Sequence, residues 1–102
     1  MSSGNVVDFA TLTVADSSVG LADASPAYTA GANVLGFVAT LETAEIRWRS
    51  DGTAPTTSEG HILSVGQVLQ FTDKNYTDLV KNIRFIRTGG TSGKLKITYF
   101  GR

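Results

Sequence analysis

The chain contains no cysteine, two prolines and a single histidine among its 102 residues. The lack of cysteine excludes disulfide bonds and thiolate metal sites, so packing or contacts between subunits must supply the stability. The one histidine, His61, leaves no imidazole set for zinc, and no serine lies in a nucleophile-elbow motif. We therefore expect no catalytic residues, no metal site and no cofactor, and we predict that the protein is not an enzyme.

Long apolar runs are also missing, since none approaches the roughly 18 residues that span a membrane. The first five residues carry no Lys or Arg and no apolar segment follows them, so we expect no secretory signal. These absences predict a soluble protein that does not contact a membrane.

The net charge is zero, so the protein lacks the bulk positive field that attracts nucleic acid, and we expect no direct nucleic-acid readout. Charge is nevertheless uneven, because no Lys or Arg precedes Arg47 and no Asp or Glu follows Lys81. We favour a sandwich in which acidic early strands lie beside basic late ones, since surface charge usually only solubilises. The alternative is that an acidic patch on one subunit meets a basic patch on the next.

Short strand-like segments separated by turn residues dominate the chain. The segments 10–14, 45–49 and 94–100 alternate between apolar and polar residues, which predicts half-buried strands. Their expected inward residues are Leu12, Val14, Ile46, Trp48, Leu95, Ile97 and Tyr99. In 34–42 we expect Phe37, Ala39 and Leu41 on one face and Val34, Gly36 and Val38 on the other.

Further short strands are expected at 18–21, 60–63, 67–71 and 83–87, with at most one short helical turn within 72–82. Residues 88–93 are expected to join the last two strands as a hairpin. About eight short strands predict an all-β fold, a jelly-roll-like or Greek-key β-sandwich. We expect an extended N-terminal arm at 1–9 and a single β-sandwich domain at 10–102.

Three segments invite a chemical interpretation that the residues do not sustain. The loop 51–60 offers Asp51, Thr53 and Glu59 for calcium, but it has too few carboxylates. Glu42 and Glu45 are an odd number of residues apart, so on a strand they face opposite sides and are expected to be solvated. The glycine-rich 88–93 precedes a strand rather than a helix, which excludes a phosphate loop.

Arginines flank aromatic residues at Arg47, Trp48 and Arg49, and again around Phe85. Alternation places Trp48 and Phe85 on the face opposite their neighbouring arginines, which argues against base stacking. The arginines then form an exposed basic stripe. That stripe is either an interface or a solvated face, and the sequence does not decide between them.

Two segments carry a family resemblance: IRWRSDGTAPTTSEG at 46–60 and IRFIRTGGTSGKLKITY at 83–99. With the opening TLTVADSS at 11–18, they resemble stretches of small virion-associated proteins of tailed bacteriophages. The resemblance implies a β-sandwich on the outside of a capsid, or at the neck or tail, that stabilises neighbouring subunits. Decoration or cement proteins of this type are often trimers bound where capsid subunits meet.

We therefore expect a structural protein of a tailed-phage particle, made in the host cytoplasm and located in the virion, with the major capsid protein or other virion proteins as its partners. A capsid decoration or cement role and a homotrimer are favoured, and a neck or tail component is the alternative. A small carbohydrate-binding sandwich, using Tyr28, Trp48 or Tyr76, is the alternative from another class. The candidate subunit-interface residues are Val6, Val7, Phe9, Arg47, Arg49, Arg84, Arg87, Lys94 and Lys96.

Overall fold

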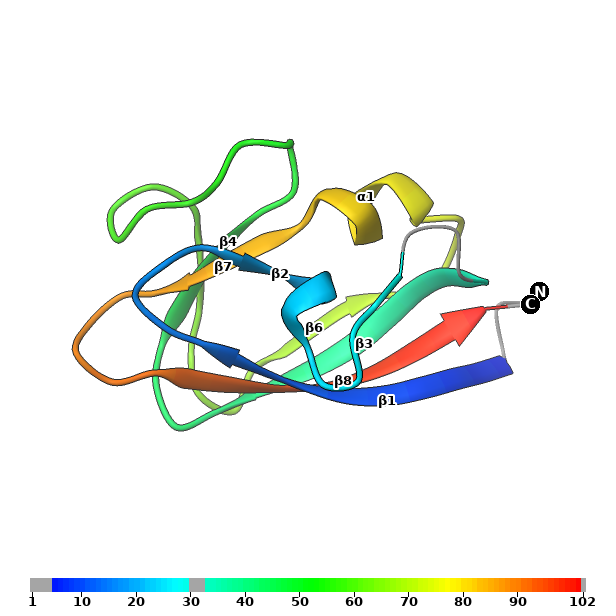
Figure 1. Cartoon of the computed structure of the whole chain (residues 1–102), viewed down its shortest axis with the longest axis horizontal. Helices are drawn as coiled ribbons and strands as arrows, with labels where there is room; N and C mark the ends of the chain where they lie inside the picture. Colours follow the sequence, from blue (N-terminus) through cyan, green and yellow to red (C-terminus); the bar gives the residue numbers. More distant parts are fainter. Residues whose placement is uncertain (1–4, 30–32, 102) are drawn as a thin grey trace.

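The computed structural model describes residues 5–29 and 33–101, which form two layers of β-strands (Figure 1). The strands are β1 (Asn5–Val14), β2 (Val19–Gly20), β3 (Val34–Glu42), β4 (Ile46–Arg49), β5 (His61–Leu63), β6 (Val68–Phe71), β7 (Arg84–Arg87) and β8 (Gly93–Gly101). A 3-10 helix, η1 (Leu21–Asp23), and one short α-helix, α1 (Thr77–Asn82), complete the described elements. The predicted all-β class is confirmed.

The strands form two antiparallel four-stranded sheets that face each other. Sheet A has the order β1-β8-β3-β6, and sheet B has the order β2-β7-β4-β5. Each sheet interleaves strands from both halves of the chain, and this order of eight strands in two sheets is that of a jelly roll. The jelly-roll-like sandwich expected from the sequence is therefore present.

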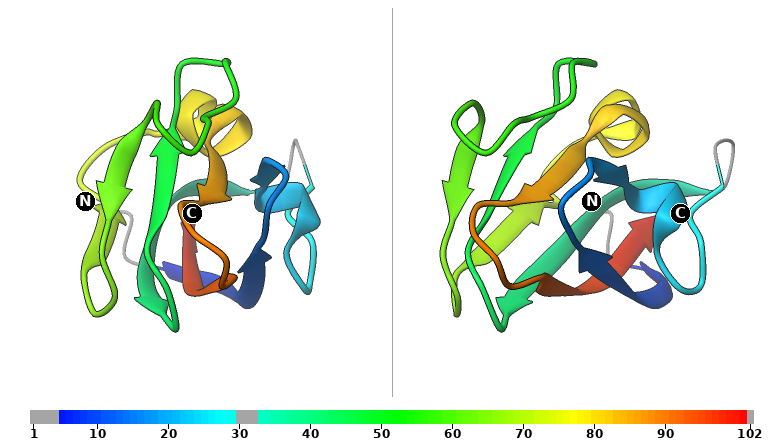
Figure 2. Two further views of the ribbon diagram at one scale, coloured as in Figure 1. Left: turned by 90° about the vertical axis from the view of Figure 1, so that its left-hand side faces the viewer. Right: turned by 60° about the vertical axis from the view of Figure 1, so that its left-hand side comes forward.

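Most connections pass from one sheet to the other, as the turned views show (Figure 2). The predicted hairpin between the last two strands is wrong, because β7 belongs to sheet B and β8 to sheet A. β8 instead lies between β1 and β3 and pairs with both. Alternation along a strand shows which face is apolar, but the neighbouring strand depends on contacts far away in sequence.

The core lies between the sheets and contains the residues that alternation placed inward. Leu12, Ile46 and Leu95 are at most 1% exposed, and Trp48 packs against this core while remaining half-buried. Val34 differs from the prediction, because it is only 4% exposed although we expected it opposite Phe37. A register shift between Val34 and Gly36 rotates the strand there and turns Val34 inward.

Helix α1 closes one end of the sandwich between β6 and β7 (Figure 1). It occupies only the second half of the predicted 72–82 segment. The side chain of Asn75 accepts a hydrogen bond from the Thr77 N–H at 2.9 Å, which satisfies one free donor of the first turn. Val80 buries the apolar side of this turn against the core.

The predicted arm is not separate from the domain in its described part. β1 already begins at Asn5, which pairs with Gly101 of β8, so residues 5–9 continue the strand that we expected to start at residue 10. Residues 1–4 lie outside the described part of the chain.

Candidate protein interface

The outer surface of sheet A carries a continuous set of exposed and half-exposed side chains, which we call the open face. Alternating positions of four strands contribute to it, because directly opposite residues of neighbouring strands share a face. Its members are Val6, Phe9, Thr11, Thr13, Val38, Thr40, Glu42, Val68, Gln70, Lys94, Lys96, Thr98 and Phe100.

Apolar side chains gather toward one end of the open face. Val6 is 64% exposed and Phe9 54% exposed, and Phe100 lies directly opposite Val6. Phe9 stands in one row with Thr98 and Val38. Val68 of the edge strand β6 is 54% exposed, but it lies opposite Thr40 in the row of Lys96, away from this end. Exposed apolar side chains that cluster on one flat face are typical of a protein-contact surface.

Charged side chains gather toward the other end of the open face. Lys94 lies directly opposite Glu42 on the neighbouring strand, and both side chains are exposed. Among the described residues these two charges form no ion pair, whereas Lys96 donates to the Thr11 hydroxyl at 3.3 Å. Both charges of the Lys94–Glu42 row thus remain available to pair with another molecule.

The free edge of β1 is partly occupied, so contact through the side-chain face is easier than strand addition. Thr11 exchanges two backbone hydrogen bonds with Ser25, at 3.0 and 2.9 Å. The carboxylate of Asp8 accepts the neighbouring Phe9 N–H at 2.8 Å. A register shift between Val6 and Asp8 places Val7, 42% exposed, in a bulge at this edge. Bulges and occupied backbone groups both hinder edge-to-edge pairing.

The outer surface of sheet B is different, because its arginines hold loops of the same chain. Arg47 donates to the carbonyl oxygens of Gly60 at 2.7 Å and Thr57 at 3.0 Å. Arg49 forms a bidentate pair with Asp51, with distances of 3.1 and 2.6 Å. The loop between β4 and β5, green in Figure 1, accordingly stands over sheet B on the side away from sheet A.

Gly60 allows this loop to approach β4 closely. Its φ is +140°, and a Cβ built there would lie 3.1 Å from the Trp48 carbonyl oxygen and 3.2 Å from Cβ of Pro55. Both the backbone conformation and the close contacts therefore favour glycine. Pro55, which is buried, anchors the loop at the same place.

The two arginines of β7 are also engaged within the chain. Arg84 donates to the hydroxyl of Ser18 at 2.7 Å and to its carbonyl oxygen at 2.9 Å, so it holds the β1–β2 connection. Arg87 pairs in register with Ile46, an inward-facing residue, and donates to the Ser92 hydroxyl at 3.2 Å. It therefore lies on the opposite face of sheet B from Arg84.

The nine predicted interface residues thus do not form one surface. Val6, Phe9, Lys94 and Lys96 come together on the open face, and Val7 lies at its edge. Arg47, Arg49 and Arg84 lie on the far side of the sandwich, and the hydrogen bonds of all four arginines correct the expected free basic stripe.

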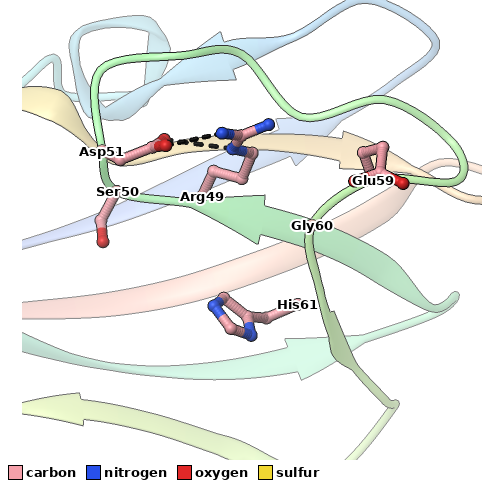
Figure 3. A pocket seen from close by; sticks show the side chains of 6 residues that line it. All are labelled: Arg49, Ser50, Asp51, Glu59, Gly60 and His61. Atoms are coloured by element: carbon pink, nitrogen blue, oxygen red, sulfur yellow. Dashed lines mark hydrogen bonds and ion pairs between the residues drawn. The ribbon is translucent and has the colours of Figure 1, made fainter.

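A surface pocket of about 380 Å³ lies at the end of strands β4 and β5, lined by Arg49, Ser50, Asp51, Glu59, Gly60 and His61 (Figure 3). Its side chains do not converge. Arg49 and Asp51 meet on one side of β4, whereas the His61 ring lies on the other side, where it contacts Trp48 at a centroid distance of 4.7 Å. The hydrogen bond from Arg49 lowers the pKa of Asp51, so this carboxylate stays ionised and engaged.

The polar-tipped aromatic residues that a sugar site would need mostly support the fold. Trp48, Tyr76 and Tyr28 are half-buried and pack against the core. Tyr76 also donates to Asp73 at 2.5 Å, and this hydrogen bond lowers the pKa of Asp73 and raises that of Tyr76. None of the three stands out as a flat platform for stacking.

Tyr99 is an inward-facing residue of β8 with an unusual environment. It is 2% exposed, and within the described residues its hydroxyl has no hydrogen-bond partner. Burial, with smaller contributions from Asp8 and Tyr28, raises the pKa of Tyr99 to about 12. This hydroxyl therefore stays protonated and serves packing rather than chemistry.

The described residues contain no group of three His, Cys, Asp or Glu side chains placed to hold a metal ion. Over the same part of the chain, no helix has the length and apolar character needed to cross a membrane. Comparison with protein-family models, curated proteins and solved structures found no match for this chain.

Sequence reasoning missed the part of the open face that β3 and β6 supply. Thr40 and Glu42 of β3 and Val68 of β6 belong to it. Alternation in 34–42 did place Val38 opposite Phe37, which was the available signal. The sequence did not show that β3 pairs with β8. This pairing joins the outward residues of the two strands into one surface.

Proposed function

We propose that this protein is a non-catalytic structural protein that acts by binding other protein subunits through its open face. The observation that carries the proposal is the contrast between the two outer surfaces. Exposed apolar side chains and unpaired charges gather on sheet A, whereas the arginines of sheet B are already bonded to loops. A surface that combines exposed apolar side chains with unpaired charges suits protein association.

The particle to which these subunits belong is, in this proposal, a tailed-phage virion. Support comes from the sequence resemblance of 46–60 and 83–99 to small virion-associated proteins. The jelly roll is compatible with this role, since the fold occurs in viral capsid proteins, but it also occurs in lectins and enzymes and does not fix function. Within this proposal a decoration or cement role on the capsid is favoured over a neck or tail position.

Co-sedimentation with the capsids of the phage that encodes the protein tests this function. We expect the full chain to pellet with capsids in saturable amounts and to raise the temperature at which the shell opens. A double charge reversal on the open face, Lys94→Glu with Lys96→Glu, is expected to weaken binding by roughly tenfold or more, because like charges across an interface are costly. Lys74→Glu, exposed on the loop before α1, is the control for a charge reversal outside the open face and should bind normally.

Wild-type protein that stays in the supernatant at all concentrations would rule out a role on the capsid. The number of copies per particle separates the two positions. A decoration protein saturates at hundreds of copies and a neck or tail component at few, as quantitative mass spectrometry of purified particles would show.

A further inference from the structure

The open face is not only exposed but complementary to itself. Its apolar end, around Val6 and Phe9 of β1, and its charged end, at Lys94 of β8 and Glu42 of β3, lie at opposite ends of sheet A along the strand direction. Lys94 and Glu42 have opposite charge, share one cross-strand row and are both exposed without an ion pair among the described residues. A surface of this kind can satisfy its own charges when two copies meet.

A two-fold axis gives such a match if it lies just above the open face, parallel to the strands and over the line midway between β8 and β3. Rotation about this axis places β8 over the β3 strand of a second copy, because these two strands are the central pair of sheet A. Each cross-strand row of residues then faces the same row of the second copy. Lys94 comes to lie over the partner's Glu42, and by symmetry Glu42 lies over the partner's Lys94.

The same axis places each end of the sheet over the same end of the second copy, with β1 over β6, so Phe9 comes to lie over Gln70 of that copy. The end of the sheet that carries Phe9 faces the equivalent end of the second copy, and two sheets stacked this way have the aligned packing that is common in β-sandwiches. An axis running across the strands would instead place Lys94 of each copy over the Val6 and Phe9 end of the other. That arrangement would bury charges against apolar groups, which is unfavourable.

We infer that the subunit covering the open face is a second copy of this chain, in a two-fold dimer with reciprocal Lys94–Glu42 contacts. This inference rests on the proposed function, because it names the partner of the same surface. It replaces the trimer that the family resemblance implies, since a three-fold arrangement does not make the open face contact itself.

A pair of charge reversals tests the dimer. Light scattering coupled to size-exclusion chromatography, over a wide concentration range, should show a dimer for the wild-type chain. Lys94→Glu alone creates two acidic contacts between copies, and Glu42→Lys alone creates two basic ones. Each variant is expected to dissociate at roughly tenfold or more higher concentration than the wild type.

Mixing the two variants gives the decisive result. In a mixed pair, the lysine introduced by Glu42→Lys in one copy faces the glutamate introduced by Lys94→Glu in the other. The two native charges face each other at the second contact, so both contacts join opposite charges. We therefore expect the mixture to form heterodimers at concentrations where each variant alone is monomeric. The control Lys74→Glu should leave the dimer unchanged, and circular dichroism should show that every variant remains folded.

Several outcomes would overturn the inference: a wild-type monomer at all concentrations, a trimer, a dimer insensitive to both reversals, or single variants whose mixture stays monomeric. The two proposals fail separately. A monomer that still pellets with capsids would leave the proposed function standing without the dimer. A charge-sensitive dimer that never pellets would leave the dimer standing without the capsid role.

Discussion

The two outer surfaces of the sandwich use basic residues in different ways. On sheet B, Arg47 and Arg84 direct their guanidinium groups to carbonyl and hydroxyl oxygens of the same chain. On sheet A, Lys94 remains exposed without an ion pair among the described residues. The planar guanidinium presents several donors in fixed directions and suits the holding of a loop, whereas an ammonium on a flexible stem suits a surface that meets another molecule.

This contrast shows that a basic residue on a strand is not in itself evidence of an interface. The sequence presents Arg47, Arg84 and Lys94 in similar alternating patterns, and only the hydrogen-bond partners separate them. A residue whose donors are satisfied within the chain contributes to stability. A residue whose charge is left free is available for binding, and this difference can be measured.

The largest effect is expected from loss of the Arg47 side chain. Arg47→Ala removes two hydrogen bonds from a charged donor to the Thr57 and Gly60 carbonyls, so we expect a loss of about 2 to 3 kcal/mol in the free energy of unfolding. Urea denaturation followed by tryptophan fluorescence measures this, since Trp48 lies on the same strand.

Arg47→Lys provides the control for charge. It keeps the positive charge but loses the geometry that reaches two carbonyl groups, so it should recover less than half of the lost stability. Full recovery by lysine would contradict the role assigned to the guanidinium, and the distinction between the two sheets would weaken.

The next effect concerns β8, the strand that supplies both lysines of the open face on one side and Tyr99 to the core on the other. Because the pKa of Tyr99 is raised to about 12 in the folded state, its contribution to stability is complete below the ordinary pKa near 10 and is lost as pH rises from about 10 to 12. A shift of this size corresponds to about 2 to 3 kcal/mol.

Tyr99→Phe tests this dependence. The variant keeps the ring and removes a buried hydroxyl that has no partner among the described residues, so it should be at least as stable as the wild type at pH 7. It should also lose less stability between pH 10 and 12, as denaturation at a series of pH values would show. If Tyr99→Phe lost as much stability between pH 10 and 12 as the wild type, ionisation of Tyr99 would not be the cause of that loss.

The sequence was sufficient to predict the class of fold and most inward-facing residues. Strict alternation identified Leu12, Ile46 and Leu95 as core residues, because each strand packs one face against the opposite sheet. Periodicity is a local signal, and the burial of alternate residues follows from it directly.

The same signal could not predict which strands are neighbours or which polar groups meet. The 83–87 and 94–100 segments looked like a hairpin, but long-range pairing places β8 between β1 and β3. Arg84 and its partner Ser18 are 66 residues apart in sequence, so nothing local indicates their hydrogen bond. The candidate interface depends on both kinds of long-range contact, and for that reason it was only partly predicted.

A smaller effect is expected at the turn that leads from the charged end of the open face into sheet B. Thr43 has a φ of +84°, and the Ala44 N–H donates to the Glu42 carbonyl at 3.0 Å, which makes a tight γ-turn. This conformation is strained for a β-branched residue. Thr43→Gly should therefore increase the free energy of unfolding by about 1 kcal/mol.

Thr43→Val is the matched variant, because it keeps the β-branch and should not relieve the strain. Thermal unfolding of both variants measures the difference. A destabilised Thr43→Gly protein would show that the cost of glycine in the unfolded chain exceeds the strain released at this turn.

The smallest effect on folding is expected where the effect on association is expected to be largest. Lys94→Ala should change the free energy of unfolding by no more than about 0.5 kcal/mol, because the side chain is exposed and has no ion pair within the described part of the chain. Arg47→Ala, measured in the same buffer, is the reference for a basic residue that supports the fold. If Lys94→Ala destabilised the monomer as much as Arg47→Ala, Lys94 would be a structural residue and the open face would lose its most informative charge. If stability is unchanged while the dissociation constant of the dimer rises, the free charge on sheet A acts between molecules rather than within one.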